Sequence, residues 1–236
     1  MAFKRVGHKG AGLVAPGNTK ASFDAALAAG VDMVEFDVLA RDYRDPENSE
    51  LVLSHDYDHL AKGPVLTLEE GLAHLADRTF ADVDFNVDLK TRGYERRVVE
   101  ALRRHGLVDR VLISTYHLES LDAVRELEPR IRLGWSVPNV RRDYTRSKLM
   151  IVPALILLQA FKRLVPGRAA REIRRGRCHA LMAHWRLVTR RLVRAVHDAG
   201  GELYVWTVDE APAIRRLEAL GVDGIISNDP RLFAGG

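Results

Sequence analysis

The sequence is poor in several features, and each shortage excludes a class of protein. Its 236 residues include one cysteine, Cys178, so an internal disulfide is impossible and a reducing compartment is expected. No Ser-rich or Gly-rich linker divides the chain, and we expect residues 1–236 to form one domain. The N-terminal residues contain no apolar signal segment, which makes the cytoplasm the expected location.

Positive charge is the feature in excess. The chain has a formal net charge of +4 at pH 7 and a pI near 9.3. Much of the excess falls in one stretch, at Arg141, Arg142, Arg146, Lys148, Lys162, Arg163, Arg168, Arg171, Arg174, Arg175 and Arg177. Such clustering indicates an anionic partner such as phosphate, a lipid headgroup or nucleic acid, and a solvated helix face is the alternative. Of these partners, nucleic acid is not expected.

The pattern of apolar residues predicts strands that alternate with helices. We expect strands at residues 5–8, 33–39, 84–90, 111–115, 132–137, 180–183, 203–208 and 224–227. We expect helices at 19–29, 95–105 and 188–199, a capping box at Thr67, and helices that end near Leu127 and Leu220. Asn18 is the expected N-cap of the first helix. Eight strands in a chain near the typical size of about 250 residues predict an α/β fold, a (β/α)8 TIM barrel, with a doubly wound sheet as the alternative.

A further apolar segment, residues 51–55, interrupts this alternation. Only a short loop separates it from the strand at 33–39, whereas a parallel neighbour would need a crossover of about a dozen residues or more. We therefore expect a hairpin at the barrel rim, whose returning arm brings His55 close to Asp37.

Two carboxylates lie two residues apart in the strand at 33–39. Glu35 and Asp37 point to the same face, because successive residues of a strand alternate between faces. If that face is buried, the two charges repel each other unless a cation or a proton lies between them. A hard divalent metal with oxygen ligands resolves the conflict. The alternative is a half-exposed strand whose charges face solvent.

Barrel chemistry lies at the carboxyl ends of the strands. The residues expected there are His8, Glu35, Asp37, His55, Asp88, Lys90 and Trp206. Three carboxylates suit Mg²⁺ or Ca²⁺ better than zinc, which normally draws on histidine or cysteine. Two histidines can act as general acid and base, each worth about 10²- to 10⁴-fold, and Lys9 and Lys90 can bind an anionic oxygen. This combination predicts a site that cleaves a phosphodiester.

The order of short motifs resembles one known family. The motifs are His8-Lys9-Gly10, Pro16-Gly17-Asn18-Thr19, Glu35-Phe36-Asp37-Val38, Ser54-His55-Asp56, Asp88-Leu89-Lys90, Val205-Trp206-Thr207-Val208 and the run from Gly221 to Pro230. In this order they are similar to those of the glycerophosphodiester phosphodiesterases. Each motif alone is weak, but the ordered set is specific.

The resemblance implies a (β/α)8 barrel, one divalent metal, and hydrolysis of glycerophosphodiesters to an alcohol and glycerol 3-phosphate. It implies that His8 and His55 act as acid and base. It further implies that three carboxylates bind the metal and that Trp206 walls the substrate pocket. The metal-binding carboxylates would be Glu35, Asp37 and Asp88.

The sequence departs from the family pattern at several points. Lys9 stands where the family usually has arginine, which reduces a bidentate phosphate contact to a point charge. Gly17 stands where the family usually has glutamate. Asp88 also stands where the family usually has the longer glutamate, and the related sphingomyelinase D branch has aspartate at this place as well. Residues 57–64 are too few for the small insertion domain of many members, so we expect an open mouth.

A basic and apolar insertion lies between the strands expected at 132–137 and 180–183. Its apolar run, residues 148–161, is shorter than the about 20 residues that span a bilayer, and Pro153 interrupts it. A helix buried on the barrel is one interpretation. The other is peripheral membrane contact through residues 148–165, with the flanking arginines meeting anionic lipids.

Three functions therefore remain open from the sequence. The first is metal-dependent hydrolysis of glycerophosphodiesters in lipid metabolism. The second is a lysophospholipase D or sphingomyelinase D-like activity on lipid phosphodiesters, which Asp88 and the missing insertion domain favour. The third is a barrel that binds phosphate or lipid headgroups without turnover, which Gly17 and Lys9 favour.

Overall fold

The computed structural model describes residues 3–139 and 151–235. Within these ranges nine strands form one sheet, in the order β1-β9-β8-β7-β6-β5-β4-β2-β3. The strands are β1 (Lys4–Gly7), β2 (Met33–Ala40), β3 (Leu51–Leu53), β4 (Asp84–Leu89), β5 (Val111–Thr115), β6 (Arg132–Val137), β7 (Ala180–His184), β8 (Glu202–Trp206) and β9 (Gly224–Ser227). β1 pairs in parallel with both β2 and β9, so eight parallel strands close into a barrel. The predicted TIM barrel is confirmed, and the doubly wound sheet is excluded.

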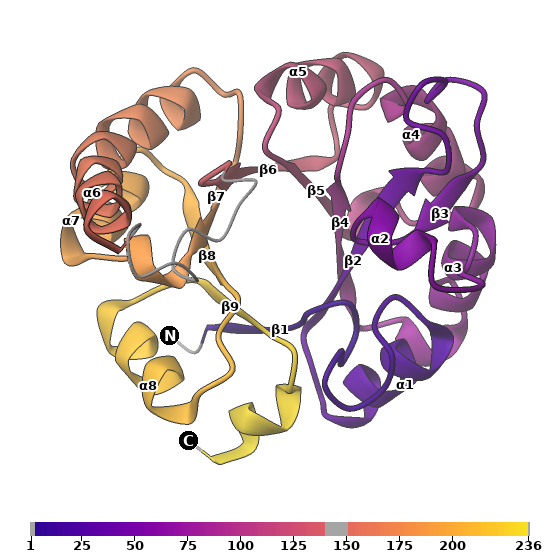
Figure 1. Ribbon diagram of the computed structural model, residues 1–236, viewed down its shortest axis with the longest axis horizontal. Helices are drawn as coiled ribbons and strands as arrows, with labels where there is room; N and C mark the ends of the chain where they lie inside the picture. The colour runs from indigo at the N-terminus through magenta and orange to yellow at the C-terminus, as the bar shows by residue number, and fades with distance from the viewer. Residues whose placement is uncertain (1–2, 140–150, 236) are drawn as a thin grey trace.

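Helices surround this barrel as an outer ring (Figure 1). In the described ranges they are α1 (Lys20–Ala28), α2 (Tyr57–Leu60), α3 (Leu68–Leu75), α4 (Glu95–Arg104), α5 (Leu118–Leu127), α6 (Ile151–Arg174), α7 (Arg190–His197) and α8 (Ala211–Leu220). The expected capping box is present at α3, where the Thr67 hydroxyl accepts from the Glu70 N–H and the Glu70 carboxylate accepts from the Thr67 N–H. The strand and helix periods therefore predicted most elements to within a few residues.

The predicted N-cap of α1 is wrong. Thr19 caps the helix by accepting a hydrogen bond from the Ser22 N–H, and Asn18 lies one residue earlier with a φ of 60°. The side chain of Asn18 instead makes two hydrogen bonds with Asp37, nineteen positions away in sequence. It donates to the Asp37 carboxylate and accepts from the Asp37 N–H. A tertiary contact has displaced the local capping preference.

The predicted returning arm of the rim hairpin is present as β3. It pairs antiparallel with the end of β2, with Leu53 opposite Val38 and Leu51 opposite Ala40. The short helix α2 follows directly, capped by the Asp56 carboxylate, which accepts from the His59 N–H. Sequence periodicity did not predict α2, because four residues are too few to show a helical repeat.

Apolar residues fill two separate regions. Val34, Phe36 and Val38 belong to the large core between the sheet and the helices. A smaller cluster occupies the barrel interior and consists of Val6, Met33, Leu112, Ala180, Met182, Tyr204 and Ile226, with Trp206 packed against it. Because inward-facing residues recur every second position, Met33 is followed at the mouth by Glu35 and Asp37. The apolar plug therefore sets the floor beneath a polar mouth.

In the described part of the insertion between β6 and β7 the chain forms one helix, α6, of 24 residues. Pro153 lies within this helical segment. The predicted contact region at 148–165 and the basic residues Arg141, Arg142, Arg146 and Lys148 lie partly or wholly outside the described residues. None of the helices in the described part of the chain is both long and apolar enough to cross a membrane.

We predict that the substitution Gly224→Ala destabilises the barrel. A methyl group at this position of β9 would overlap Cδ1 and Cε1 of the fully buried Tyr204 ring. Overpacking of this kind costs about 1–3 kcal/mol, so the urea midpoint of unfolding should fall. The matched change Gly63→Ala, with open space around it, should leave the midpoint within error; equal midpoints for both variants would contradict the interior packing.

Candidate active site

Three buried carboxylates converge at the mouth of the barrel. Ligand oxygens of Glu35, Asp37 and Asp88 all lie within 4.8 Å of one another. The parallel register of β2 and β4 causes this, because Asp37 lies directly opposite Asp88 and Glu35 lies opposite Asn86. The structure therefore brings together the three carboxylates that the sequence predicted as metal ligands.

Lys90 lies between two of these carboxylates. Its ammonium Nζ is 2.5 Å from Asp37 Oδ1 and 2.5 Å from Asp88 Oδ2. The remaining oxygens are held by neutral donors: Asn18 Nδ2 donates to Asp37 Oδ2 at 2.8 Å, and Ser114 Oγ donates to Asp88 Oδ1 at 2.7 Å. Burial alone would lower the pKa of Lys90, but the carboxylates around it raise that pKa well above its usual value. Lys90 is thus a permanent cation in the mouth.

One lysine does not neutralise three carboxylates. Burial and the charge of Asp37 raise the pKa of Glu35 well above its usual value, so in the protein alone Glu35 tends to hold a proton. Burial would also raise the pKa of Asp37, but the cations Lys90 and Lys9 outweigh it and the pKa is lowered. The mouth therefore has unmet demand for positive charge.

The donor set fits a divalent metal. Among the described residues, Asp37 Oδ1 is buried and receives no hydrogen bond, so its only compensation is the ion pair with Lys90. Carboxylate oxygens are the ligands that Mg²⁺ and Ca²⁺ prefer. A cation at this position would also lower the pKa of Glu35, which burial and Asp37 raise in the protein alone.

His8 is fixed by a chain of hydrogen bonds from the end of the sequence. Asn228 donates to both oxygens of Asp209, from its backbone N and from Nδ2, each at 2.8 Å. The amide oxygen of Asn228 must then face His8 Nδ1, 2.6 Å away, and this nitrogen carries the proton. His8 Nε2, 3.8 Å from Glu35 Oε2, is therefore the nitrogen with the free lone pair at the mouth.

Burial and the nearby charge of Lys9 lower the pKa of His8 to about 4. An ordinary histidine has a pKa near 6.5, so His8 is neutral throughout the physiological range. A neutral imidazole with its lone pair aimed at the mouth can accept a proton.

His55 stands at the rim, on the segment that follows β3. Its Nδ1 is 2.9 Å from Asp56 Oδ2, and the other oxygen of Asp56 lies 2.8 Å from His59 Nδ1. Burial and the charge of Lys90 lower the pKa of His55. Asp56 orients the ring, so Nε2 is the nitrogen left for chemistry.

Both histidines line one small cavity of about 90 Å³ at the mouth. Its other lining residues are Glu35, Asn86, Asp88, Lys90, Ser114, Tyr116, Ser136, Met182, Trp206, Thr207 and Ile226. The Trp206 indole donates to the Met182 carbonyl at 3.0 Å and faces Tyr116 edge-on, which fixes it as part of the wall. Of the residues predicted for the site, Asp37 and Lys9 lie behind this lining. Lys9 acts there through its charge and through its N–H, which donates to Glu35 Oε2 at 2.8 Å.

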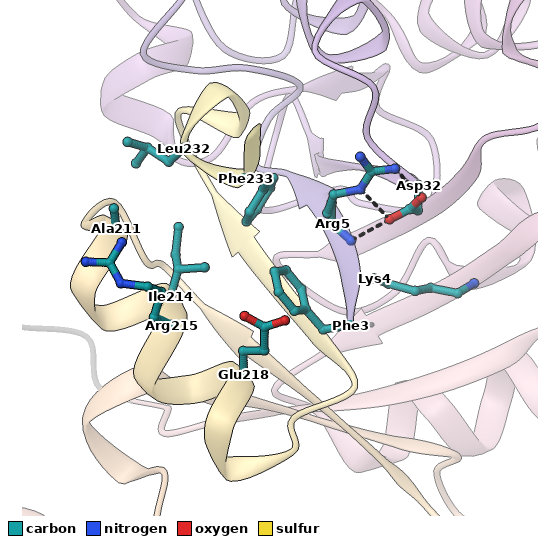
Figure 2. Close-up of a pocket in the computed structure, with 10 residues that line it drawn as sticks. All are labelled: Phe3, Lys4, Arg5, Asp32, Ala211, Ile214, Arg215, Glu218, Leu232 and Phe233. Atoms are coloured by element: carbon teal, nitrogen blue, oxygen red, sulfur yellow. Dashed lines mark hydrogen bonds and ion pairs between the residues drawn. The ribbon is translucent and has the colours of Figure 1, made fainter. Parts of the chain in front are cut away.

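A larger cavity, of about 520 Å³, lies elsewhere on the molecule. Figure 2 shows it between the start of β1, helix α8 and the C-terminal segment, with Phe3, Ile214 and Phe233 supplying its apolar walls. Arg5 lies at its edge, paired with Asp32 through two hydrogen bonds of 2.8 and 3.0 Å from its guanidinium. Since β1 begins here, this cavity is at the opposite end of the strands from the carboxylates and does not share the site.

Several residues of the site were not predicted to belong to it, namely Asn18, Ser114, Asp209 and Asn228. Asn18, Ser114 and Asn228 each hold a predicted residue in place, and Asp209 holds Asn228. Asn18 and Asn228 fall within the motifs that carry the family resemblance, so a signal was present. Which partner each would bind depends on contacts between distant segments, and periodicity carries no information on those.

Comparisons with known proteins agree with this geometry. The model of the glycerophosphoryl diester phosphodiesterase family matches residues 8–66 and 65–232. The chain is 26% identical to the glycerophosphodiester phosphodiesterase of Caldanaerobacter subterraneus, over 95% of this chain and 93% of that protein. A glycerophosphodiester phosphodiesterase from Parabacteroides distasonis has a similar fold, with a TM-score of 0.72 at 17% identity and 99% of each chain covered.

A second solved structure is a phosphodiesterase from Oleispira antarctica in complex with the product sn-glycerol-3-phosphate. It matches with a TM-score of 0.67 at 20% identity, over 96% of this chain and 93% of that one. Fold and site together define a (β/α)8 barrel that presents carboxylates, lysines and imidazoles at its mouth. With the family model covering nearly its whole length, the chain belongs to the glycerophosphoryl diester phosphodiesterase family, whose members are phosphoric diester hydrolases.

We predict that His8 stays neutral, with its proton on Nδ1, as the pH is lowered toward 4. Nitrogen-15 NMR of the imidazole in chelator-treated protein reports both the pKa and the tautomer. In Asn228→Ala the acceptor is lost, so the Nε2–H form should become populated, whereas the exposed control Asn48→Ala should leave the spectrum unchanged. A titration near pH 6.5, or an Nε2–H form in the wild type, would refute the assignment.

Proposed function

We propose that the protein hydrolyses glycerophosphodiesters to an alcohol and glycerol 3-phosphate. The observation that carries this proposal is the cluster of three buried carboxylates beside one cavity, which Glu35, Asp88 and the two oriented imidazoles line. Membership of the family supports it, as does the product-bound phosphodiesterase that shares the fold. Phosphodiester hydrolysis fits this mouth because its lysines can bind the anionic oxygens of a phosphoryl group and its imidazoles can transfer protons at the two ester oxygens.

In this proposal one divalent cation, Mg²⁺ or Ca²⁺, is held by Glu35, Asp37 and Asp88. When bound, it supplies charge that stabilises the negative phosphoryl oxygens. Glu35 binds as the carboxylate, and the Lys9 N–H holds it in place. Lys90 and Lys9 add positive charge for the phosphoryl group, and Trp206 bounds the pocket on the opposite strands.

The two histidines divide the proton transfers according to their depth. His8 is buried and neutral, with Nε2 unprotonated, so it takes the proton from the attacking oxygen. His55 is at the rim, where a leaving alcohol departs toward solvent, so it gives a proton to the leaving oxygen. Asp56 accepts from His55 Nδ1, which orients the ring and partly offsets the burial and the Lys90 charge that lower the pKa of His55.

A leaving group that needs no proton separates the two roles. In the ester of glycerol 3-phosphate with p-nitrophenol, the p-nitrophenolate leaves as a stable anion without a proton, so His55→Ala should retain near wild-type kcat on this ester. The same variant should lose about 10²- to 10⁴-fold on glycerophosphocholine, and His8→Ala should lose a similar factor on both substrates. The exposed control His197→Ala should lose nothing. Rescue of His8→Ala instead of His55→Ala would reverse the assignment.

Removal of a carboxylate tests the cation site. We expect calorimetry to detect one divalent cation per chain, and Asp37→Asn and Asp88→Asn each to weaken binding by about tenfold or more, because a carboxylate ligand is replaced by a neutral amide. The exposed change Glu47→Gln on the β2–β3 loop should preserve the affinity. Unchanged affinity in both site variants would show that the cation binds elsewhere.

A lipid substrate is the second candidate, as a lysophospholipase D or sphingomyelinase D-like activity. Only the four-residue helix α2 occupies the rim between β3 and α3 beyond its connecting loops, so the mouth stays open on this side. The shorter side chain of Asp88 leaves space beside the cation position. Activity on micellar lysophospholipid without activity on glycerophosphocholine would favour this reading over the first.

A barrel without turnover is the third candidate. Gly17 and Lys9, the two departures from the family pattern that motivate this candidate, are in contact, because a Cβ at Gly17 would lie 2.9 Å from Lys9 Cβ. A glutamate at residue 17 would therefore have to displace the lysine stem. Release of choline from glycerophosphocholine by the wild-type protein with added Mg²⁺ or Ca²⁺ would reject this candidate.

Under each of the three candidate functions, a cytoplasmic or membrane-peripheral location stays a proposal.

A further inference from the structure

Exposed large apolar side chains gather on one face of the barrel. Among the described residues they are Leu13, Val14, Tyr43, Leu155, Ile156, Leu157 and Leu164. All seven lie in connections that follow the carboxyl ends of strands: the β1–α1 loop, the β2–β3 loop and the segment after β6. The two loops lie at the end of the barrel at which the carboxylates and histidines converge, and α6 runs back from that end. Scattered exposed apolar residues are ordinary, but four of these seven fall in one stretch of α6.

Helix α6 supplies most of this apolar surface and is longer than the barrel requires. At 1.5 Å per residue its 24 residues span about 36 Å, whereas the ten-residue helices α4, α5 and α8 span about 15 Å. Its fully buried positions, from Val165 to Ile173, lie in its C-terminal part. Because α6 runs back from the carboxyl end of β6 toward the start of β7, its N-terminal half lies nearer the active-site end. Leu158 and Phe161 of this half pack partly buried against the core, and its other side faces outward.

The outward side of the N-terminal half of α6, from Leu155 to Leu164, carries apolar side chains with high exposure. Leu155 is 53% exposed, Ile156 is 66% exposed and Leu164 is 70% exposed. All three line an open apolar groove together with Ala160. In Figure 1 α6 lies on the outer edge of the ring, beside α7.

Positive charge accompanies the apolar groove. Arg163 lines the groove, and Lys162 is its neighbour in sequence. Residues 155–175 include one acidic residue, Glu172, which is buried and paired with Arg177. Two copies of the chain meeting through this face would bring like charges together, which disfavours a symmetric dimer. An anionic lipid surface instead offers both an apolar layer for the leucines and negative headgroups for the cations.

We propose that the protein docks on anionic lipid bilayers through the exposed N-terminal part of α6, from Leu155 to Leu164, with Leu13 and Val14 as a second contact. The docking itself does not rest on the proposed function, but its consequence for access of a substrate to the cavity does. Docked in this way, the mouth faces the bilayer, and a phosphodiester in a lipid headgroup reaches the cavity without leaving the surface.

Vesicle flotation tests the docking without any need for turnover. The wild-type chain should float with vesicles of equal parts phosphatidylglycerol and phosphatidylcholine and remain behind with phosphatidylcholine alone. The double change Leu155→Gln with Ile156→Gln, which keeps good helix formers, should weaken binding about tenfold or more. Its turnover of soluble glycerophosphocholine should equal that of the wild type.

Matched charge variants separate a docking surface from general attraction. Lys162→Gln with Arg163→Gln removes two charges beside the apolar groove, and Arg174→Gln with Arg175→Gln removes two at the other end of the same helix. The first pair should reduce flotation several-fold more than the second. Equal losses, absence of flotation by the wild type, or a dimer in sedimentation that Leu155→Gln with Ile156→Gln abolishes would each overturn the proposal. Flotation without turnover of any diester would leave the docking intact and defeat the proposed function alone.

Discussion

Compensation of buried negative charge is the constraint on which the mouth of this barrel depends. Three carboxylates inside a water-poor space repel one another, and burial of even one without a partner is costly. Lys90 lies between Asp37 and Asp88 and offsets part of this charge, while Glu35 avoids the rest by favouring its protonated form. A divalent cation would satisfy all three at once. The electrostatics that make the mouth strained are therefore also what make it receptive to a metal and then to a phosphate.

The barrel provides this charge cluster through simple alternation. The face of β2 that holds Met33 in the apolar plug also holds Glu35 and Asp37 one and two steps farther along. The neighbouring strand β4 adds Asp88 in register. The imidazoles are then oriented from outside the sheet, His8 by Asn228 and His55 by Asp56. Rigid strands thus place the charges, and loops place the two imidazoles, a division that suits a site built for hydrolysis.

Local sequence patterns predicted what depends on local physics. Alternation and turn residues located the strands, and the shortness of the loop before residue 51 identified the hairpin that brings His55 to the rim. The carboxylates followed from their spacing and from barrel geometry. The N-cap at Asn18 was wrong because its side chain contacts Asp37, across the fold. The role of Asn228 was missed because it depends on contacts between distant segments. Helix α2 was missed because its four residues are too few to show a helical repeat.

The central claim is that Glu35, Asp37 and Asp88 share a single divalent cation. Crystals grown with Mn²⁺, as a substitute for Mg²⁺ with strong anomalous scattering, test it most directly. The account predicts one anomalous peak bonded to oxygens of all three carboxylates, with Lys90 withdrawn from the position between Asp37 and Asp88. A peak bound instead by His55, Asp56 and His59, or Lys90 still seated between the carboxylates with no peak beside them, would contradict it.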